Sequence, residues 1–296
     1  MLASASGSTS ASPHPEQIAV LFPDIGEPYR KVFGEIVGGV EQQAQGKVRA
    51  IAVGPGQDAG ELQAALRRAG TRTVIALGRQ GLKTAGGFDG MGIVVGGITS
   101  LPDQDKWRGI SLMPDPALLF GWLKTLAPGI RRVIVVYSPQ QSQAAVRLAR
   151  DAARSHGLEL VALEAHDLAE AVRRYEAVFA GADGRRDAIW LPQDAVTADE
   201  STVLPLVLRE SWNRSVPLFS SSMLHVKKGV LFALYPDNGG LGRDLATLAL
   251  AAAAGEPGRA GLQPLRAVRI AFNTRTAGHI GLGVNIEQHQ FDVVFP

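Results

Sequence analysis

Short apolar runs alternate with helix-forming segments along most of this 296-residue chain. The runs lie near residues 18–22, 48–53, 73–77 and 93–95, and again near 133–137, 158–163, 188–191, 216–219 and 230–234. Nearly continuous apolar and β-branched residues are typical of strands buried on both faces, as in a parallel sheet covered by helices. Between the runs, helical spacing such as Leu62, Ala65 and Leu66 completes a βαβ pattern. The pattern predicts an α/β fold with doubly wound parallel sheets.

The strand pattern falls into two sets, separated by Met113-Pro114-Asp115-Pro116. Proline disfavours helical geometry in the residue before it, so this segment is expected to cross between two lobes as a hinge. We expect the lobes to exchange chain segments. Residues 17–112 plus about 238–265 are assigned to lobe 1, and residues 113–237 plus about 266–296 to lobe 2. Residues 1–16, rich in Ser and Ala, are expected to be a disordered leader or an expression scar.

Composition excludes several function classes. The chain has no cysteine, which rules out disulfides, thiolate metal sites, Fe–S clusters and a cysteine nucleophile. The 30 Lys and Arg residues are dispersed, and they nearly balance 28 Asp and Glu residues, so nucleic-acid binding is not expected. No apolar stretch approaches the roughly 20 residues of a membrane-spanning helix. The six histidines are scattered without ligand spacing, so we expect neither a metal nor a cofactor.

Open α/β sheets bind ligands beyond the carboxyl ends of their strands. If the two lobes turn those edges toward each other, the ligand lies in a cleft between them. The loops at these ends mix small polar, amide, charged and aromatic residues, which suits recognition of a solute by hydrogen bonding and stacking. The candidate ligand-binding residues are Asp24, Ile25, Glu27, Tyr29, Arg79, Gln80, Gly97, Tyr137, Ser138, Gln140, Gln193, Asp194, Ser221, Met223, Tyr235 and Asp237.

Several of these residues also have ordinary structural roles. Asp24 and Glu27 lack a third acid or a His in their loop, so loop solvation is favoured over acid–base catalysis. Arg79, at the expected start of a helix, could hold an anionic group or form a surface salt bridge. The Ser220–Ser222 run lacks a G-x-S-x-G motif, and hydroxyl contacts or helix capping explain it better than a nucleophile does. We predict no catalytic residue.

The order of five segments resembles a known family. They are Trp107–Leu112, Leu126–Val133, Asp187–Asp194, Val216–Ser221 and Asn273–Leu282. Together they resemble ABC-transporter substrate-binding proteins with the type 1 periplasmic binding fold, in the family that contains tryptophan/tyrosine-type solute-binding components. The resemblance runs from about Gln17 to Val284. It implies a monomeric periplasmic receptor that captures a small solute by hinge closure and delivers it to a membrane transporter.

Two departures from the family pattern leave the cargo open. The loop after the first strand is Pro23–Tyr29, where the family has a His-Pro or Thr/Ser-rich loop. The loop after the third strand carries Arg79 and Gln80, where the family has small Gly and Thr residues. One alternative is a carrier of a larger apolar or lipid-like cargo, such as a sterol, between envelope components. The other, not favoured, is an enzyme on the same scaffold. A signal segment or a lipid anchor would lie outside the given sequence.

Overall fold

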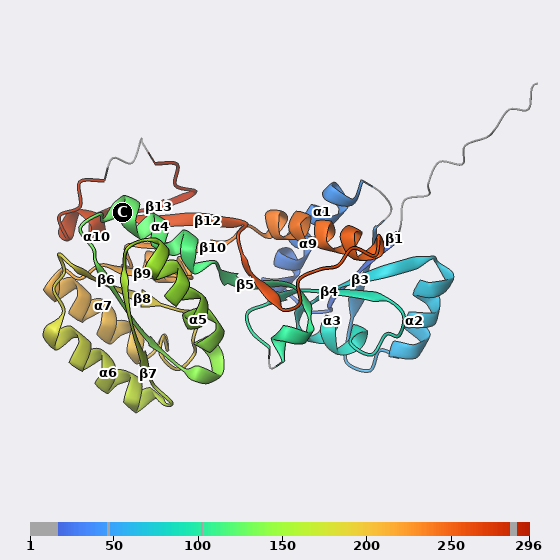
Figure 1. Cartoon of the computed structure of the whole chain (residues 1–296), viewed down its shortest axis with the longest axis horizontal. Coiled ribbons are helices and arrows are strands. Elements are labelled where there is room, and N and C mark those ends of the chain that lie inside the picture. Colours follow the sequence, from blue (N-terminus) through green and yellow to red (C-terminus); the bar gives the residue numbers. More distant parts are fainter. Residues whose placement is uncertain (1–16, 46–47, 102, 285–288) are drawn as a thin grey trace, which may run out of the picture.

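Two α/β units follow one another along the long axis of the molecule (Figure 1). The computed structural model describes residues 17–45, 48–101, 103–284 and 289–296. The predicted leader therefore lies outside the described residues. Strands of the first sheet run in the order β11-β5-β4-β3-β1-β2, and every neighbouring pair is parallel. They are β1 (Gln17–Pro23), β2 (Val48–Val53), β3 (Thr71–Leu77), β4 (Gly92–Ile98), β5 (Arg108–Pro114) and β11 (Leu262–Leu265).

The second sheet has the order β13-β12-β10-β9-β8-β6-β7, and among its described pairs β10 and β12 alone are antiparallel. Its strands are β6 (Arg132–Tyr137), β7 (Glu159–Glu164), β8 (Asp187–Leu191), β9 (Leu218–Ser220), β10 (Phe232–Pro236), β12 (Val268–Asn273) and β13 (Val293–Phe295). Two mostly parallel sheets flanked by helices confirm the predicted fold class. The apolar runs of the sequence did not include β5, β11, β12 and β13, of which β11 and β13 have only four and three residues.

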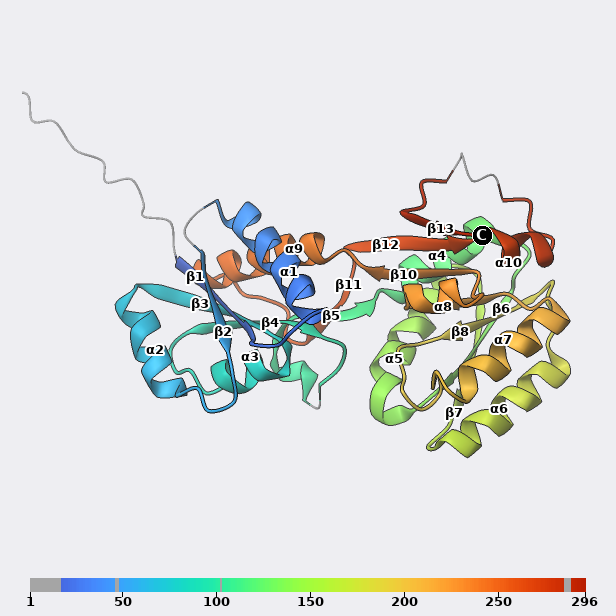
Figure 2. The ribbon, with the colours of Figure 1, turned by 180° about the vertical axis from the view of Figure 1, so that it is seen from behind.

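Helices cover both sheets (Figures 1 and 2). Around the first sheet lie α1 (Tyr29–Ala44), α2 (Ala59–Arg68), α3 (Gly78–Ala85), the short 3₁₀ helix η1 (Gln104–Lys106) and α9 (Asn238–Ala253). Around the second lie α4 (Pro116–Leu126), α5 (Pro139–Ser155), α6 (Leu168–Gly181), α7 (Val203–Arg214), α8 (Met223–Lys227) and α10 (Thr274–His279). Because α9 packs on α1 and β11 pairs with β5, the late segment 238–265 lies with the first sheet. We propose that lobe 1 comprises residues 17–112 and about 238–265, and that lobe 2 comprises residues 113–237 and about 266–296.

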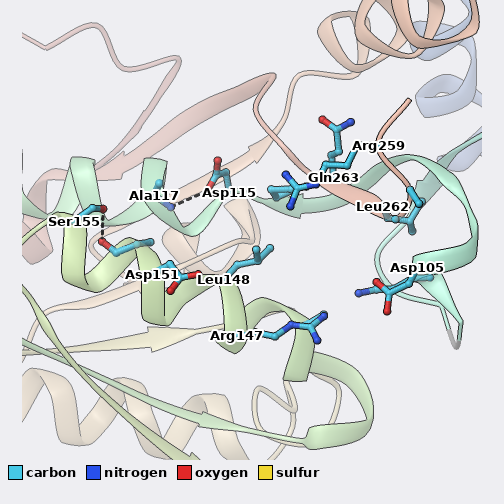
Figure 3. Close-up of a pocket in the computed structure, with 16 residues that line it drawn as sticks. Asp105, Asp115, Ala117, Arg147, Leu148, Asp151, Ser155, Arg259, Leu262 and Gln263 are labelled. Carbon is cyan, nitrogen blue, oxygen red and sulfur yellow. Dashed lines mark hydrogen bonds between the residues drawn. The ribbon is translucent and has the colours of Figure 1, made fainter. Parts of the chain in front are cut away.

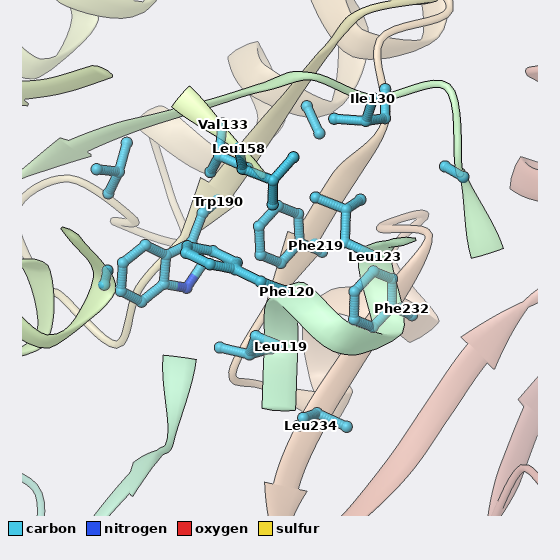
Figure 4. Packing of buried hydrophobic residues seen from close by; sticks show 14 of the residues in the cluster. Leu119, Phe120, Leu123, Ile130, Val133, Leu158, Trp190, Phe219, Phe232 and Leu234 are labelled. Atoms are coloured by element: carbon cyan, nitrogen blue, oxygen red, sulfur yellow. The ribbon is translucent and has the colours of Figure 1, made fainter. Parts of the chain in front are cut away.

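Each sheet is buried by apolar side chains on both faces, which explains its near-continuous hydrophobic strands. In lobe 2, one of these clusters is rich in aromatic rings (Figure 4). Phe120 meets Trp190 and Phe219 edge-on at centroid distances of 6.1 Å, and Phe219 stacks on Phe232 at 5.4 Å. Offset and edge-on aromatic pairs add to the stabilisation from burial. This core gives the lobe 2 side of the cleft a firm support.

In lobe 1, α1 and α9 pack unusually closely. A Cβ atom on Gly39 would lie 2.1 Å from the Gly239 carbonyl oxygen, and one on Gly242 would lie 2.0 Å from the Ile36 carbonyl oxygen. Only glycine permits backbones to approach so closely. In the chain, α9 follows β10 of the second sheet, and this contact holds it on lobe 1.

Within the described ranges, three crossings join the lobes: β5 to α4, β10 to α9, and β11 to β12 (Figure 1). Asp115 ties two of them together. Its amide donates to the Leu265 carbonyl at 2.8 Å, and its carboxylate accepts from Ala117 N–H at 2.9 Å and from Arg266 at 2.5 Å. In the remaining crossing, Asp237 pairs with Arg243 and Arg269 at 3.6 and 3.4 Å. A helix cap and ion pairs therefore connect the crossing segments to one another.

Candidate functional site: a cleft between the lobes

A cavity of about 910 Å³ lies between the two lobes. Lobe 1 lines it with Arg79, Gly97, Ile98, Thr99, Ser100, Leu101 and Leu112, and lobe 2 with Gln140, Gln141, Gln193 and Ala195. The lobe 1 residues come mainly from the carboxyl ends of β3 and β4, and the lobe 2 residues follow β6 and β8. The site thus forms where parallel strands end, as the rule for open α/β sheets requires.

Two glycines shape the lobe 1 wall. Gly78 and Gly97 have φ angles of 67° and 69°, a backbone conformation that residues other than glycine rarely adopt. A Cβ on Gly97 would meet the Gly78 amide nitrogen at 3.2 Å. These glycines bring the ends of β3 and β4 together and place Arg79 in the first turn of α3. The Arg79 side chain is exposed, and its Nη2 donates to the Ser100 carbonyl at 3.4 Å, the outer limit of a hydrogen bond.

On the lobe 2 side, the buried Asp194 carboxylate organises the wall. Its Oδ2 accepts from the Ser138 amide and the Ser142 hydroxyl, each at 2.8 Å. Its Oδ1 accepts from the amides of Val196 at 3.0 Å and Thr197 at 3.1 Å. Because the carboxylate is 4% exposed and has four protein donors, it holds the loops after β6 and β8 together. The structure gives Asp194 a positioning role behind the cavity.

Each of the three glutamines of the cavity uses one atom of its side-chain amide, the oxygen or the nitrogen, in a hydrogen bond to the protein. The Gln141 oxygen accepts from the Ala195 amide at 2.9 Å, and the Gln193 nitrogen donates to the Ser221 carbonyl at 3.1 Å. The Gln140 oxygen accepts from the Ser138 hydroxyl at 2.9 Å. Their other amide ends have no protein partner among the described residues. Lobe 2 therefore presents fixed amides with unused hydrogen-bonding groups.

Of the predicted ligand residues, four line this cavity: Arg79, Gly97, Gln140 and Gln193. Ser138, Asp194 and Ser221 lie directly behind it, through the contacts just given. Gln80, the neighbour of Arg79, instead donates to the Gly54 carbonyl at 3.1 Å. Residue-type reasoning missed the other seven lining residues, which are Ile98, Thr99, Ser100, Leu101, Leu112, Gln141 and Ala195. Most of them nevertheless belong to the strand ends and the loops after them, where the sequence pattern places the ligand.

The other predicted residues lie away from the cavity lining. Asp24, Ile25 and Glu27 are exposed on the loop after β1, and the exposed Tyr29 begins α1; β1 lies on the opposite side of β3 from β4. Met223 begins α8, Tyr235 is near the end of β10, and Asp237 is held by the hinge arginines. Their contact with a ligand stays a prediction.

Tyr137 faces the protein interior. It is 3% exposed, and its hydroxyl donates to Glu164 at 2.8 Å. Burial, together with the hydrogen bond and negative charge of Glu164, raises the pKa of Tyr137. Although Tyr137 ends β6 at the correct edge of the sheet, its side chain packs in the lobe 2 core. Stacking of its ring on a ligand also stays a prediction.

A second cavity, of about 630 Å³, lies beside the hinge (Figure 3). Asp105, Arg259 and Gln263 reach it from lobe 1, whereas Arg147 and Asp151 on α5 reach it from lobe 2. Figure 3 shows Arg147 and Asp105 on opposite sides of the opening. The cavity lining carries both signs of charge, in contrast to the first cavity, whose one charged lining side chain is Arg79 among the described residues.

A smaller cavity, of about 450 Å³, on lobe 2 includes His225. The His225 ring lies 2.8 Å from the Ser220 hydroxyl, and burial, with the positive charge of Lys228, lowers its pKa despite the opposing charge of Glu200. Within the described ranges, no three His, Asp or Glu residues are grouped so as to hold a metal ion. Over the same ranges, no helix is long and apolar enough to span a bilayer.

Two α/β lobes, the crossings between them and a cavity lined from both sides define a two-lobed binding protein. A model of the ABC transporter substrate-binding protein family matches residues 120–283, more than half of the chain. The chain therefore belongs to the ABC transporter substrate-binding protein family, as the sequence motifs predicted. No curated protein sequence matches the chain.

Solved structures show the same fold. A ligand-free, open substrate-binding protein with adhesive properties from Clostridium difficile matches with a TM-score of 0.66 at 15% identity, covering 95% of this chain and 99% of that one. An ABC domain in complex with L-Trp from Streptococcus pneumonia matches with a TM-score of 0.57 at 17% identity and the same coverage. A conserved domain protein from Vibrio cholerae has a TM-score of 0.55 at 15% identity, again with the same coverage. At such identities these likenesses establish the type 1 periplasmic binding fold, and not the ligand.

Proposed function

We propose that this protein is an extracytoplasmic receptor that captures a small solute between its lobes and delivers it to an ABC-type membrane transporter. The cavity of about 910 Å³, lined from both lobes, carries the proposal. A ligand that contacts both lobes favours the closed state, because only that state makes all of the contacts. The protein then acts as a monomer in the periplasm, and it binds its cargo without a chemical step. Family membership supports the transporter partner.

A pair of spin labels tests closure directly, because the natural chain has no cysteine to compete for labelling. Gln57 follows β2 in lobe 1 and Gln143 lies on α5 in lobe 2; both are exposed, and neither lines the cavity. Gln57→Cys with Gln143→Cys, labelled and measured by pulsed electron spin resonance, should show a shorter distance when small-molecule extract of the native host is added to stripped protein. A pair within lobe 1, Gln57→Cys with Lys83→Cys, should not change. An unchanged interlobe distance contradicts capture by closure.

Delivery has a separate test. The liganded protein should stimulate ATP hydrolysis by its transporter, reconstituted in proteoliposomes, and stripped protein should stimulate it less. The alternative of an apolar or lipid-like cargo stays a prediction. Its candidate contacts are Phe22, Ile25, Tyr29 and Met223, none of which lines the cavity, and Ile25 and Tyr29 are 39% and 60% exposed. Mass spectrometry of material extracted from natively purified protein distinguishes the two, because recovery of lipid would favour the alternative.

A further inference from the structure

The cavity between the lobes presents hydrogen-bond donors from both sides. The assignment for two glutamines follows from their partners. Gln141 must use its oxygen to accept from the Ala195 amide, which leaves its NH₂ group without a protein partner among the described residues. The Gln140 oxygen accepts from the Ser138 hydroxyl at 2.9 Å, which leaves its NH₂ group unused; because a hydroxyl can donate or accept, this orientation is the one in the structure and is not dictated by the partner. Gln193 is reversed: its nitrogen is bound to the Ser221 carbonyl, and its oxygen is the unused atom.

Arg79 adds the one charged side chain of the described cavity lining. Its guanidinium makes a single 3.4 Å hydrogen bond, to the Ser100 carbonyl, and no ion pair with a carboxylate of the described residues. A guanidinium has five N–H donors in a planar fork that matches a carboxylate or a phosphate. Most of its donors are therefore available to a ligand in the cavity.

The same lining lacks a partner for a positive charge. Among the described residues, no Asp or Glu lines the cavity. The nearby Asp194 carboxylate already accepts four hydrogen bonds behind the wall. Asp24 and Glu27 follow β1, the neighbour of β3, and neither of them lines the cavity. An ammonium group placed in the cavity would lose water without gaining a carboxylate, which is costly in free energy.

An aromatic platform is also missing from the described lining, whose apolar members are Ile98, Leu101, Leu112 and Ala195. A ring could pack against these side chains but would find no ring to stack on. Charge and hydrogen bonding therefore decide what the cavity selects.

We propose that the cleft selects a small organic anion, a carboxylate or a phosphate ester, that carries no amino group. The anionic group binds Arg79 of lobe 1, and on closure the NH₂ groups of Gln140 and Gln141 donate to it from lobe 2. The Gln193 oxygen accepts from a hydroxyl on the ligand body. This proposal rests on the proposed function, since it assigns a ligand class to the same cleft.

Titration calorimetry with matched pairs tests the proposal on stripped full-length protein. The pairs are succinate and aspartate, 2-oxoglutarate and glutamate, and glycerol 3-phosphate and serinol phosphate, each differing chiefly by the amino group. We expect an amine-free member to bind at least tenfold more tightly than its partner. Preference for either dicarboxylate identifies a carboxylate site, and preference for glycerol 3-phosphate identifies a phosphate-ester site. Tighter binding of the amino compounds, or no binding of any of the six, overturns the proposal.

Variants on one helix link the selectivity to Arg79. Arg79→Gln should weaken binding of the preferred anion at least tenfold, and Arg79→Lys should weaken it less, because the charge is retained but the fork is lost. Lys83→Gln, one turn later on α3 and outside the cavity, is the matched control and should leave affinity unchanged. Equal effects of Arg79→Gln and Lys83→Gln would contradict a specific contact. The interlobe distance measurement tests the proposed function separately from the ligand class. If the lobes close around a different solute, the proposed function is retained and the proposal of an amine-free anion is rejected.

Discussion

The two walls of the cleft differ in how they are built. On lobe 2, Asp194 is buried, accepts four hydrogen bonds, and fixes the loops that carry the cavity glutamines. On lobe 1, Arg79 is exposed and held by one long hydrogen bond, and Asp24 and Glu27 are exposed on a neighbouring loop. Lobe 2 thus offers a preorganised, neutral surface, whereas lobe 1 offers a charge that a ligand can recruit. Preorganisation lowers the entropic cost of binding, and the free charge supplies selectivity.

The largest expected effect comes from breaking the lobe 2 wall. Asp194→Ala leaves the Ser138, Val196 and Thr197 amides and the Ser142 hydroxyl without their acceptor. Buried donors that lose a charged acceptor are costly, and we expect the free energy of unfolding to fall by about 3–5 kcal/mol. Urea denaturation followed by circular dichroism measures it. Asp151→Ala, on α5 and paired with the exposed Arg154, is the control and should change it by less than about 0.5 kcal/mol. Equal losses would contradict the assigned role of Asp194.

The second effect concerns the support of lobe 1. Gly39→Ala puts a Cβ against the Gly239 carbonyl between α1 and α9, and we expect about 1–3 kcal/mol of destabilisation from overpacking. Gly38 is its neighbour on α1, and a Cβ added there would have no neighbouring atom within 4 Å. Gly38→Ala should therefore stabilise the helix by up to about 1 kcal/mol through helix propensity. Thermal unfolding of both variants measures the contrast. Loss of stability in both would show that the close approach is not the cause.

The third prediction is a pH dependence that arises from Asp187 in lobe 2. Burial alone raises the pKa of Asp187, but hydrogen bonds from Arg132 and the Asp183 amide, with the charge of Arg132, outweigh burial and hold that pKa below its usual range. A carboxyl with a lowered pKa in the folded state stabilises the fold above its unfolded pKa of about 3.9. That stabilisation disappears as the pH falls through the lower, folded-state pKa.

Asp187→Asn removes the negative charge that pairs with Arg132 and one of the two carboxylate oxygens that accept its hydrogen bonds. We expect a loss of about 1–3 kcal/mol at neutral pH. Below a pH of about 4 the variant should lose stability less steeply than the natural protein. Urea denaturation at a series of pH values measures the slope, and Asp151→Asn serves as an exposed control. Parallel acid profiles for Asp187→Asn and the natural protein would contradict the role of this ion pair.

The fold class and part of the cavity lining could be predicted from the sequence. The fold class follows from the apolar strand runs, because strands buried on both faces need nearly continuous hydrophobic residues. The strand-end loops with Arg79, Gly97, Gln140 and Gln193 follow from the ligand rule for open sheets, and the structure brings these four residues together. A strand-end position does not, however, fix where a side chain points.

Two details depended on three-dimensional information. Tyr137 ends β6 at the cleft edge, but side chains alternate along a strand, and its ring lies on the core side. Asp24 and Arg79 follow neighbouring strands of the same sheet, yet the cavity is lined from the loops after β3 and β4, and the loop after β1 contributes no lining residue. Strand order arises from long-range pairing, which local sequence patterns do not encode.

The smallest effect is expected at Asp24, and it bears most directly on the ligand. The carboxylate is exposed and has no hydrogen bond or ion pair with any described residue, so Asp24→Ala should change the free energy of unfolding by less than about 0.5 kcal/mol. If the ligand is an amine-free anion at Arg79, its affinity should also stay within about twofold, because Asp24 does not line the cavity and salt screens an exposed charge. Calorimetry and urea denaturation on one preparation measure both. A large loss of affinity with unchanged stability would instead place the β1 loop against the ligand and restore a carboxylate partner for an amino group.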